Sequence, residues 1–313
     1  MRNLSKVFLT ALKDKSGILS PILDRVKKDD TLMLAVRDGY INIYYRGGNL
    51  LKITPGAHGK SAFQAHFDEK YDDSNQHIAF RNLSLPGGID NRADTYKWIS
   101  CIPQLKEIMD FWFCRHPKQE RECQQIVARE NNRSPISKST EYFITDIEYT
   151  VANIKARFDM LAVHWPAKKN GTECRAALIE MKYGDSALTG KAGLIDHLRD
   201  IDAFLSDKRN YVELLATIKA QFEQLGDLGL IKHKKCATGS TIQLTSNPKP
   251  EFIFLLANHN PRSPKLKKLL MDPEVKKLAS SARFDLSFFV SSEAGYGMYS
   301  RSMLPYDEYL NRK

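Results

Sequence analysis

The chain has 313 residues, with 47 Lys and Arg against 37 Asp and Glu, which gives a net charge of +10. This length allows one large core or two moderate ones. The basic balance favours a polyanionic partner, with nucleic acid as the first expectation. The five cysteines are odd in number and show no Cys-x-x-Cys spacing, which argues against a disulfide framework and a zinc ribbon.

The N-terminus has no apolar run long enough for a signal peptide, and no stretch is long enough to span a membrane. We therefore expect a cytoplasmic protein without a membrane partner. Residues 1–30 show two short helical faces. The apolar positions of these faces are Leu4, Val7, Phe8, Leu12, Ile18, Ile22 and Val26.

A strand-rich stretch follows, with short apolar runs at 31–36, 40–45 and 50–53. Glycines between these runs predict a β-meander. Residues 67–95 are polar and irregular, which suggests a loose domain boundary near residue 100. We expect residues 1–103 to form a domain of a helix and a β-meander, whose role the sequence does not indicate, and residues 104–313 to form a second domain.

In the second domain, helical and strand patterns alternate. Helices are expected within 108–113 and 119–131, at 191–205, 208–225 and 265–270, and strands from 142 onwards, at 252–256 and at 284–290.

Two apolar strands in this domain carry charges where strands rarely tolerate them. Residues 156–163 contain Asp159, and residues 175–183 contain Glu180 and Lys182. The intervening Asn170-Gly171 dipeptide is a strong hairpin signal. A two-residue turn there would place Asp159 opposite Lys182, and residue 161 opposite Glu180. Because opposed residues and residues two apart share a face, the three charged groups are expected to meet.

A slip of one residue would send Asp159 to the opposite face, and Pro166 leaves a longer or bulged loop open. The simpler alternative is a charged ladder on a solvated face. However, both strands are apolar on both faces, which is typical of buried central strands. Buried charge is costly unless it is paired or bound to metal, so a functional site is the better explanation.

This part of the chain resembles the PD-(D/E)XK superfamily, the restriction-endonuclease-like nucleases. The resemblance lies in the order of elements: a helix, hairpin strands with Asp and Glu-x-Lys, a second helix and a further strand. The resemblance covers roughly residues 118–260. It implies an α/β (α+β) fold with a mixed central β-sheet flanked by helices. It also implies that Asp159 and Glu180 bind metal, that Lys182 is the catalytic lysine, and that the backbone carbonyl of Met181 faces the metal. Phe158 stands where the family's name expects proline.

The resemblance suggests additional site residues. Many members place a glutamate on the helix before the sheet, and Glu122 borders the buried face of that helix well. His197 lies on the helix after the motif, where a polar residue often faces the active site. For both, an ordinary exposed helix residue is the alternative. Four basic residues are expected to contact nucleic acid: Lys191, Lys232, Lys234 and Lys235. The alternative is that they belong to solvated loops.

These residue types suit Mg²⁺, with Mn²⁺ as a substitute, because Mg²⁺ prefers oxygen ligands and usually takes one or two carboxylates. The expected reaction is hydrolysis of a phosphodiester by in-line attack, in DNA rather than RNA and in endonuclease rather than exonuclease mode. A role in restriction or defence against foreign DNA follows from the resemblance alone. The alternatives are a non-catalytic nucleic-acid-binding module or a protein-interaction module that retains the fold. The sequence is compatible with a homodimer and with a complex that contains a partner subunit.

Overall fold

The computed structural model describes residues 1–57, 61–71, 83–150, 157–166, 173–232, 242–260, 262–291 and 295–311. These residues form helices, one antiparallel sheet and one mixed sheet, which confirms the expected α/β (α+β) class. Among them, no helix is long and apolar enough to cross a membrane. The chain divides into an N-terminal unit, Arg2–Gln125 with Gln224–Leu230, and a C-terminal unit, Ile126–Glu223 with Ile231–Lys313.

The boundary between the units differs from the one expected after residue 103. Helix α4 (Arg92–Arg115) is continuous through that position. It packs on α2 (Ser20–Lys28) and β3 (Gly48–Pro55), and these contacts keep it within the N-terminal unit. The division falls inside α5 (Gln119–Asn132). The polar composition of residues 67–95 therefore does not mark the end of a unit.

The N-terminal unit contains the predicted meander. Strands β1 (Leu32–Val36), β2 (Ile41–Tyr45) and β3 pair antiparallel in chain order. Gly39 joins the first two strands with a φ of 76°, a conformation that glycine adopts without steric cost. A fourth strand, β4 (Phe63–His66), which was not predicted, pairs with β3.

Helix α1 (Lys6–Lys13) begins at Ser5, whose Oγ accepts from the Phe8 N–H at 3.2 Å. Phe8 and Leu12 are buried one turn apart. Val7 was expected on the same face, but it is 75% exposed. Successive helix residues are about 100° apart around the helix axis. Val7 therefore points away from the buried face that Phe8 and Leu12 share.

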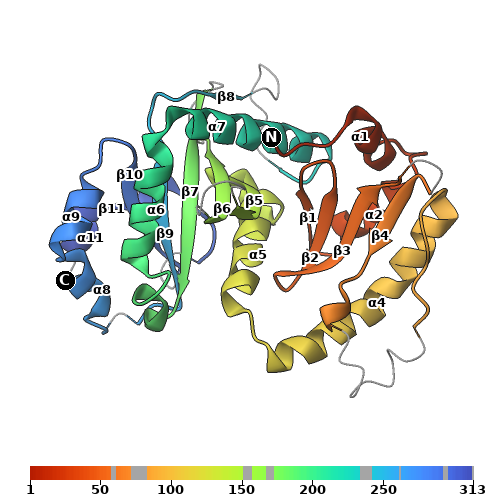
Figure 1. The fold of residues 1–313 in the computed structure, drawn as a ribbon, viewed down its shortest axis with the longest axis horizontal. Helices are drawn as coiled ribbons and strands as arrows, with labels where there is room; N and C mark the ends of the chain where they lie inside the picture. Colours follow the sequence, from red (N-terminus) through yellow and green to blue (C-terminus); the bar gives the residue numbers. More distant parts are fainter. Residues whose placement is uncertain are drawn as a thin grey trace. The chain divides into compact units, whose positions relative to one another are not determined.

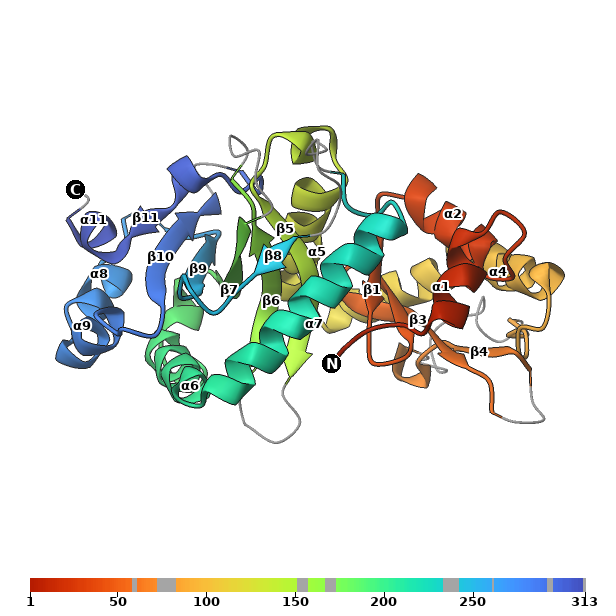
Figure 2. The same cartoon turned by 90° about the horizontal axis from the view of Figure 1, so that it is seen from above.

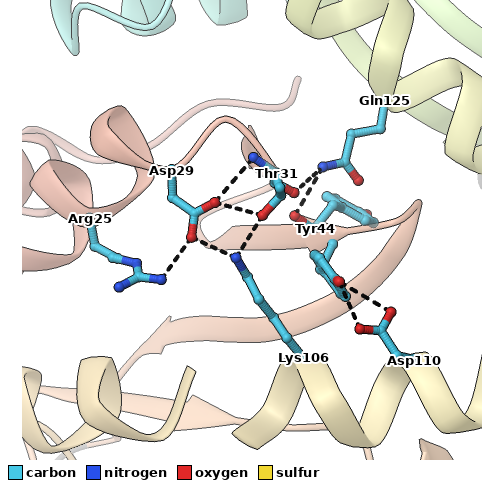
Figure 3. A network of polar contacts seen from close by, with 8 residues as sticks. Arg25, Asp29, Thr31, Tyr44, Lys106, Asp110 and Gln125 are labelled. Atoms are coloured by element: carbon cyan, nitrogen blue, oxygen red, sulfur yellow. Dashed lines mark hydrogen bonds and ion pairs between the residues drawn. The ribbon is translucent and has the colours of Figure 1, made fainter. Parts of the chain in front are cut away.

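A polar network ties the start of the meander to the helices of the N-terminal unit (Figure 3). Lys106 of α4 donates to the Asp29 carboxylate and to the Thr31 hydroxyl, each at 2.6 Å. Arg25 of α2 donates to the same carboxylate at 2.7 Å. The Gln125 side chain of α5 donates to the Thr31 carbonyl at 2.7 Å. Each of these partners comes from a different element, so the network fixes how those elements pack.

The C-terminal unit contains a mixed sheet with the strand order β11-β10-β9-β7-β6-β5, and β8 pairs with β7 (Figure 1). Strands β5, β6 and β7 pair antiparallel in chain order. Strand β9 lies parallel to β7, and β10 lies parallel to β9. The strands are β5 (Tyr142–Thr150), β6 (Arg157–His164), β7 (Glu173–Tyr183), β8 (Gln243–Leu244), β9 (Glu251–Ala257), β10 (Asp285–Val290) and β11 (Leu304–Pro305).

Helices α6 (Leu194–Ser206) and α7 (Lys208–Asp227) cover one face of this sheet (Figures 1 and 2). Gln221 of α7 donates to the buried Asp146 carboxylate of β5 at 2.8 Å, and its neighbour Phe222 meets the Phe143 ring of the same strand. The remaining elements of the unit are η2 (Pro135–Lys138), η3 (Asp185–Leu188), α8 (Lys265–Leu270), α9 (Pro273–Ala279), η4 (Ser300–Ser302) and α11 (Tyr306–Leu310).

Candidate active site

The charged strands form the predicted antiparallel pair, but the predicted register is wrong. Leu161 lies opposite Leu178 and not opposite Glu180, a displacement of two residues. At the turn end of the described ladder, His164 pairs with Arg175. Asn170 and Gly171 lie outside the described residues. Because side chains alternate with a period of two, this displacement leaves Asp159 on the face of Glu180 and Lys182.

Asp159 is 5% exposed and lies where the β6–β7 ladder ends. Its Oδ2 accepts a hydrogen bond from the Met181 backbone N–H at 2.9 Å. The carboxylate thereby replaces the strand partner that this N–H lacks. In an extended strand, the N–H and C=O of one residue point toward the same neighbour. The Met181 carbonyl therefore lies on the Asp159 side of β7.

Glu180 and Lys182 lie near the carboxyl end of β7, 3% and 4% exposed. Lys182 Nζ donates to Glu180 Oε1 at 2.8 Å and to the Ala192 carbonyl at 3.0 Å. His197 Nε2 lies 2.9 Å from the same Glu180 oxygen and 3.0 Å from the same carbonyl. Both acceptors lack a proton to donate, so His197 carries its proton on Nε2. The structure thus brings His197 into the site, as expected.

This polar group is enclosed by apolar strands. Glu180 lies beside Phe254 of β9, and Lys182 lies beside Leu256. Burial alone raises the pKa of the Glu180 carboxyl. Hydrogen bonding from His197 and the positive charge of Lys182 outweigh burial, and they place this pKa below its ordinary value. Glu180 is therefore held as a carboxylate in a largely apolar frame.

The loop before α6 supplies a contact that no sequence signal predicted. Ala192 has a φ of 62°, which is uncommon for a residue other than glycine. In this conformation its carbonyl receives Lys182 and meets His197. Strained backbone of this kind is frequent at functional sites, and here it joins β7 to the first turn of α6.

Glu122 does not join this group. It belongs to the N-terminal unit, where its carboxylate accepts from Arg46 Nε at 2.5 Å, and no described contact connects it to Glu180. Lys191 and Lys232 are exposed. Lys234 and Lys235 lie outside the described residues.

The donors fit a hard cation in number and type. They comprise two carboxylates and the Met181 carbonyl, and Mg²⁺ commonly takes one or two protein carboxylates and completes its shell with water. Glu180 Oε2 accepts no hydrogen bond from the residues that the structure describes, so this oxygen is open to a ligand. Among those residues, no group of three or more His, Cys, Asp or Glu side chains is placed to hold a metal ion, so a cation at this site would take most of its ligands from water.

A second buried polar cluster lies at the opposite ends of these strands. Glu251 accepts from the Tyr142 hydroxyl at 2.7 Å, from Arg175 at 3.2 Å and contacts His164 Nδ1 at 2.9 Å. His164 Nε2 is 2.9 Å from Ser300 Oγ. This Ser–His–Glu order resembles a hydrolytic triad, but the Ser300 N–H donates to the Glu141 carboxylate and cannot stabilise an oxyanion. The cluster fastens the C-terminal segment to the sheet.

No protein-family model, curated protein or solved structure matches this chain.

Proposed function

We propose that the protein is a Mg²⁺-dependent nuclease with a restriction-endonuclease-like core, acting on DNA more readily than on RNA. One observation carries the proposal: Asp159, Glu180 and Lys182 are buried together on one sheet face, with His197 completing the group. The order of helix α5, strands β5 to β7, helix α6 and strand β9 also supports it.

The residues have distinct chemical roles in this proposal. Asp159, Glu180 and the Met181 carbonyl hold Mg²⁺, which when bound supplies an activated water and neutralises charge on the phosphate. Lys182 stabilises the negative charge that develops on the phosphate oxygens. His197 and the Ala192 carbonyl keep the Lys182 ammonium and the Glu180 carboxylate in fixed positions.

A basic surface supports a polyanionic substrate. Helices α8 and α9 carry five exposed lysines, and none of them forms a close ion pair with the residues that the structure describes. α8 packs on η3, which directly follows β7. Exposed, unpaired lysines contact phosphates without reading sequence. The lysines are Lys265, Lys267, Lys268, Lys276 and Lys277.

Cleavage assays test the proposal. Plasmid, linear double-stranded and single-stranded DNA, and RNA, are incubated with the protein in Mg²⁺, Mn²⁺ or EDTA. Glu180→Gln and Lys182→Ala are compared with Glu213→Gln, a variant of an exposed glutamate on α7. We expect metal-dependent cleavage that both site variants lose and the control retains. Metal-dependent binding without cleavage would favour the non-catalytic module, and equal activity in all variants would contradict the assignment of the site.

A further inference from the structure

A second pair of polar side chains lies beside the proposed active site. Asp185 follows β7 in η3, and His259 follows β9. These strands are parallel neighbours, so both residues lie at carboxyl ends of the sheet, where ligands commonly bind in such folds. The Gly184 N–H donates to the Ala257 carbonyl at 2.8 Å and holds the two strand ends together.

The pair is close to Lys182 along the sheet. Lys182 is the register partner of Leu256, and His259 follows three residues later. β9 ends at Ala257 and Asn258 has a φ of 53°, so the chain turns after the strand. Three residues span at most about 10 Å, so a nucleotide bound across the strand ends can reach both side chains.

The contact between Asp185 and His259 has the form of a catalytic dyad. His259 Nδ1 lies 2.7 Å from Asp185 Oδ1, and the side chains are only 11% and 13% exposed. The same oxygen accepts from the Asn260 N–H at 3.2 Å. Burial alone raises the pKa of Asp185, but its contacts with Ser263, His259 and the Asn260 amide outweigh burial and lower it. Asp185 is therefore an ionised acceptor, and Nδ1 carries the proton that points at it.

This arrangement leaves His259 Nε2 for another partner. Nε2 makes no hydrogen bond with any residue that the structure describes. A carboxylate that accepts a hydrogen bond from Nδ1 fixes the orientation of the ring and leaves Nε2 as the atom that exchanges a proton with a ligand. The geometry is that of an imidazole prepared to transfer a proton at Nε2.

We propose that His259, oriented by Asp185, is the general acid that protonates the leaving oxygen of the cleaved phosphodiester. The attacking water gives up one proton to solvent, and its oxygen forms the new bond to phosphorus while the bond from phosphorus to the leaving oxygen breaks. That oxygen keeps the electron pair and takes the Nε2 proton, and the neutral imidazole regains a proton from solvent. This inference rests on the proposed nuclease function, and it assigns to the site a group that the Asp, Glu and Lys motif does not contain.

A change of leaving atom tests this role. The cleavage site and product ends are first mapped with wild-type protein. The oxygen that leaves is then replaced by sulfur in an otherwise identical DNA duplex. A thiol has a pKa of about 8.5 and leaves without needing a proton, whereas an alkoxide does not. His259→Gln and Asp185→Asn are compared with His116→Gln, which changes an exposed histidine of the N-terminal unit.

We expect His259→Gln to slow cleavage of the oxygen-linked duplex by about 10²-fold. Cleavage of the sulfur-linked duplex should stay close to wild type, and Asp185→Asn should give the same pattern with a smaller loss. Equal slowing on both duplexes would show a structural role only, and no slowing on either would also overturn the inference. If His259→Gln does not fold, Asp185→Asn decides by the same comparison.

The same experiment separates this inference from the proposed function. Lys182→Ala should slow cleavage of both duplexes, because Lys182 acts on the phosphate and not on the leaving atom. Wild-type protein that cleaves neither duplex in Mg²⁺ or Mn²⁺ would overturn the nuclease function and the role of His259 together. Wild-type cleavage with unaffected His259 variants would overturn only the role of His259.

Discussion

The Asp159 carboxylate accepts the backbone N–H of Met181 at 2.9 Å, so one proposed metal ligand is held by the strand that carries the other. This bond occurs just beyond the last β6–β7 register pair, Met160 with Ile179. The Asp159 side chain thus takes the place of the strand partner that Met181 lacks. The same hydrogen bond orients the Asp159 carboxylate for its proposed role as a metal ligand.

Asp159 should therefore contribute to stability and to metal binding in separable ways. Asp159→Ala leaves the Met181 N–H without its acceptor, at a cost of about 1–3 kcal/mol in the free energy of unfolding. Asp159→Asn keeps an acceptor oxygen but removes the charge. Urea unfolding should show a smaller loss for Asn than for Ala, while calorimetric titration with Mg²⁺ should show weakened binding for both. An equal loss of stability would mean that the Met181 contact contributes little.

Lys182 should matter for stability because its partner is buried. Lys182→Met removes the ammonium that compensates Glu180, and breaking such a buried pair from one side costs about 3 kcal/mol or more. Lys182→Met combined with Glu180→Gln removes the uncompensated charge and should be more stable than Lys182→Met alone. A double-mutant cycle by urea unfolding measures this coupling. Additive single effects would argue against a close pair in solution.

The lysines of α8 and α9 should govern the salt dependence of DNA binding. Lys267→Ala with Lys268→Ala removes two expected phosphate contacts, and the slope of log K against log salt should fall by about 2. Lys27→Ala with Lys28→Ala is the matched control, because these lysines are also exposed and adjacent on α2. Fluorescence anisotropy in EDTA separates binding from cleavage. A larger effect from the control pair would place the binding surface on the N-terminal unit.

The N-terminal unit should lose stability in acid through Asp29. Burial disfavours its charged form, but hydrogen bonds from Lys106, Thr31 and Arg25 outweigh burial and lower the pKa from 3.8 to about 2. A carboxylate with a lowered pKa stabilises the folded state above pH 3.8. This contribution decreases as the pH falls from 3.8 toward 2.

The difference in unfolding free energy between wild type and Asp29→Asn isolates this contribution, because the other carboxylates titrate in both proteins. Urea unfolding between pH 5 and 2 should show this difference shrinking as the pH falls. A difference that is constant with pH would contradict the assignment.

Local patterns predicted most elements of the site. The α8 helix begins and ends where its periodicity placed it, and the strands carrying Asp159 and Glu180 lie within about one or two residues of their expected bounds. Alternation also predicted which residues share a face, because a strand's side-chain period does not depend on its partner.

Contacts between distant segments needed the tertiary structure. The Asn170-Gly171 signal predicted a register that the paired residues of β6 and β7 do not follow, because pairing between two strands is set by the packing of the whole sheet as well as by the turn. The prediction that Asp159, Glu180 and Lys182 share a face still holds, because a register displacement of two residues returns each side chain to the same face.

The amino-acid sequence by itself determined the charged strands, their apolar frame and the shared face of Asp159, Glu180 and Lys182. Only the tertiary structure decided that His197 and the Ala192 carbonyl complete this group and that Asp185 orients His259. These last partners are 74 positions apart and carry no periodic pattern. They meet because β7 and β9 pair in parallel, a relationship set by packing of the whole sheet and not by any local stretch of the chain.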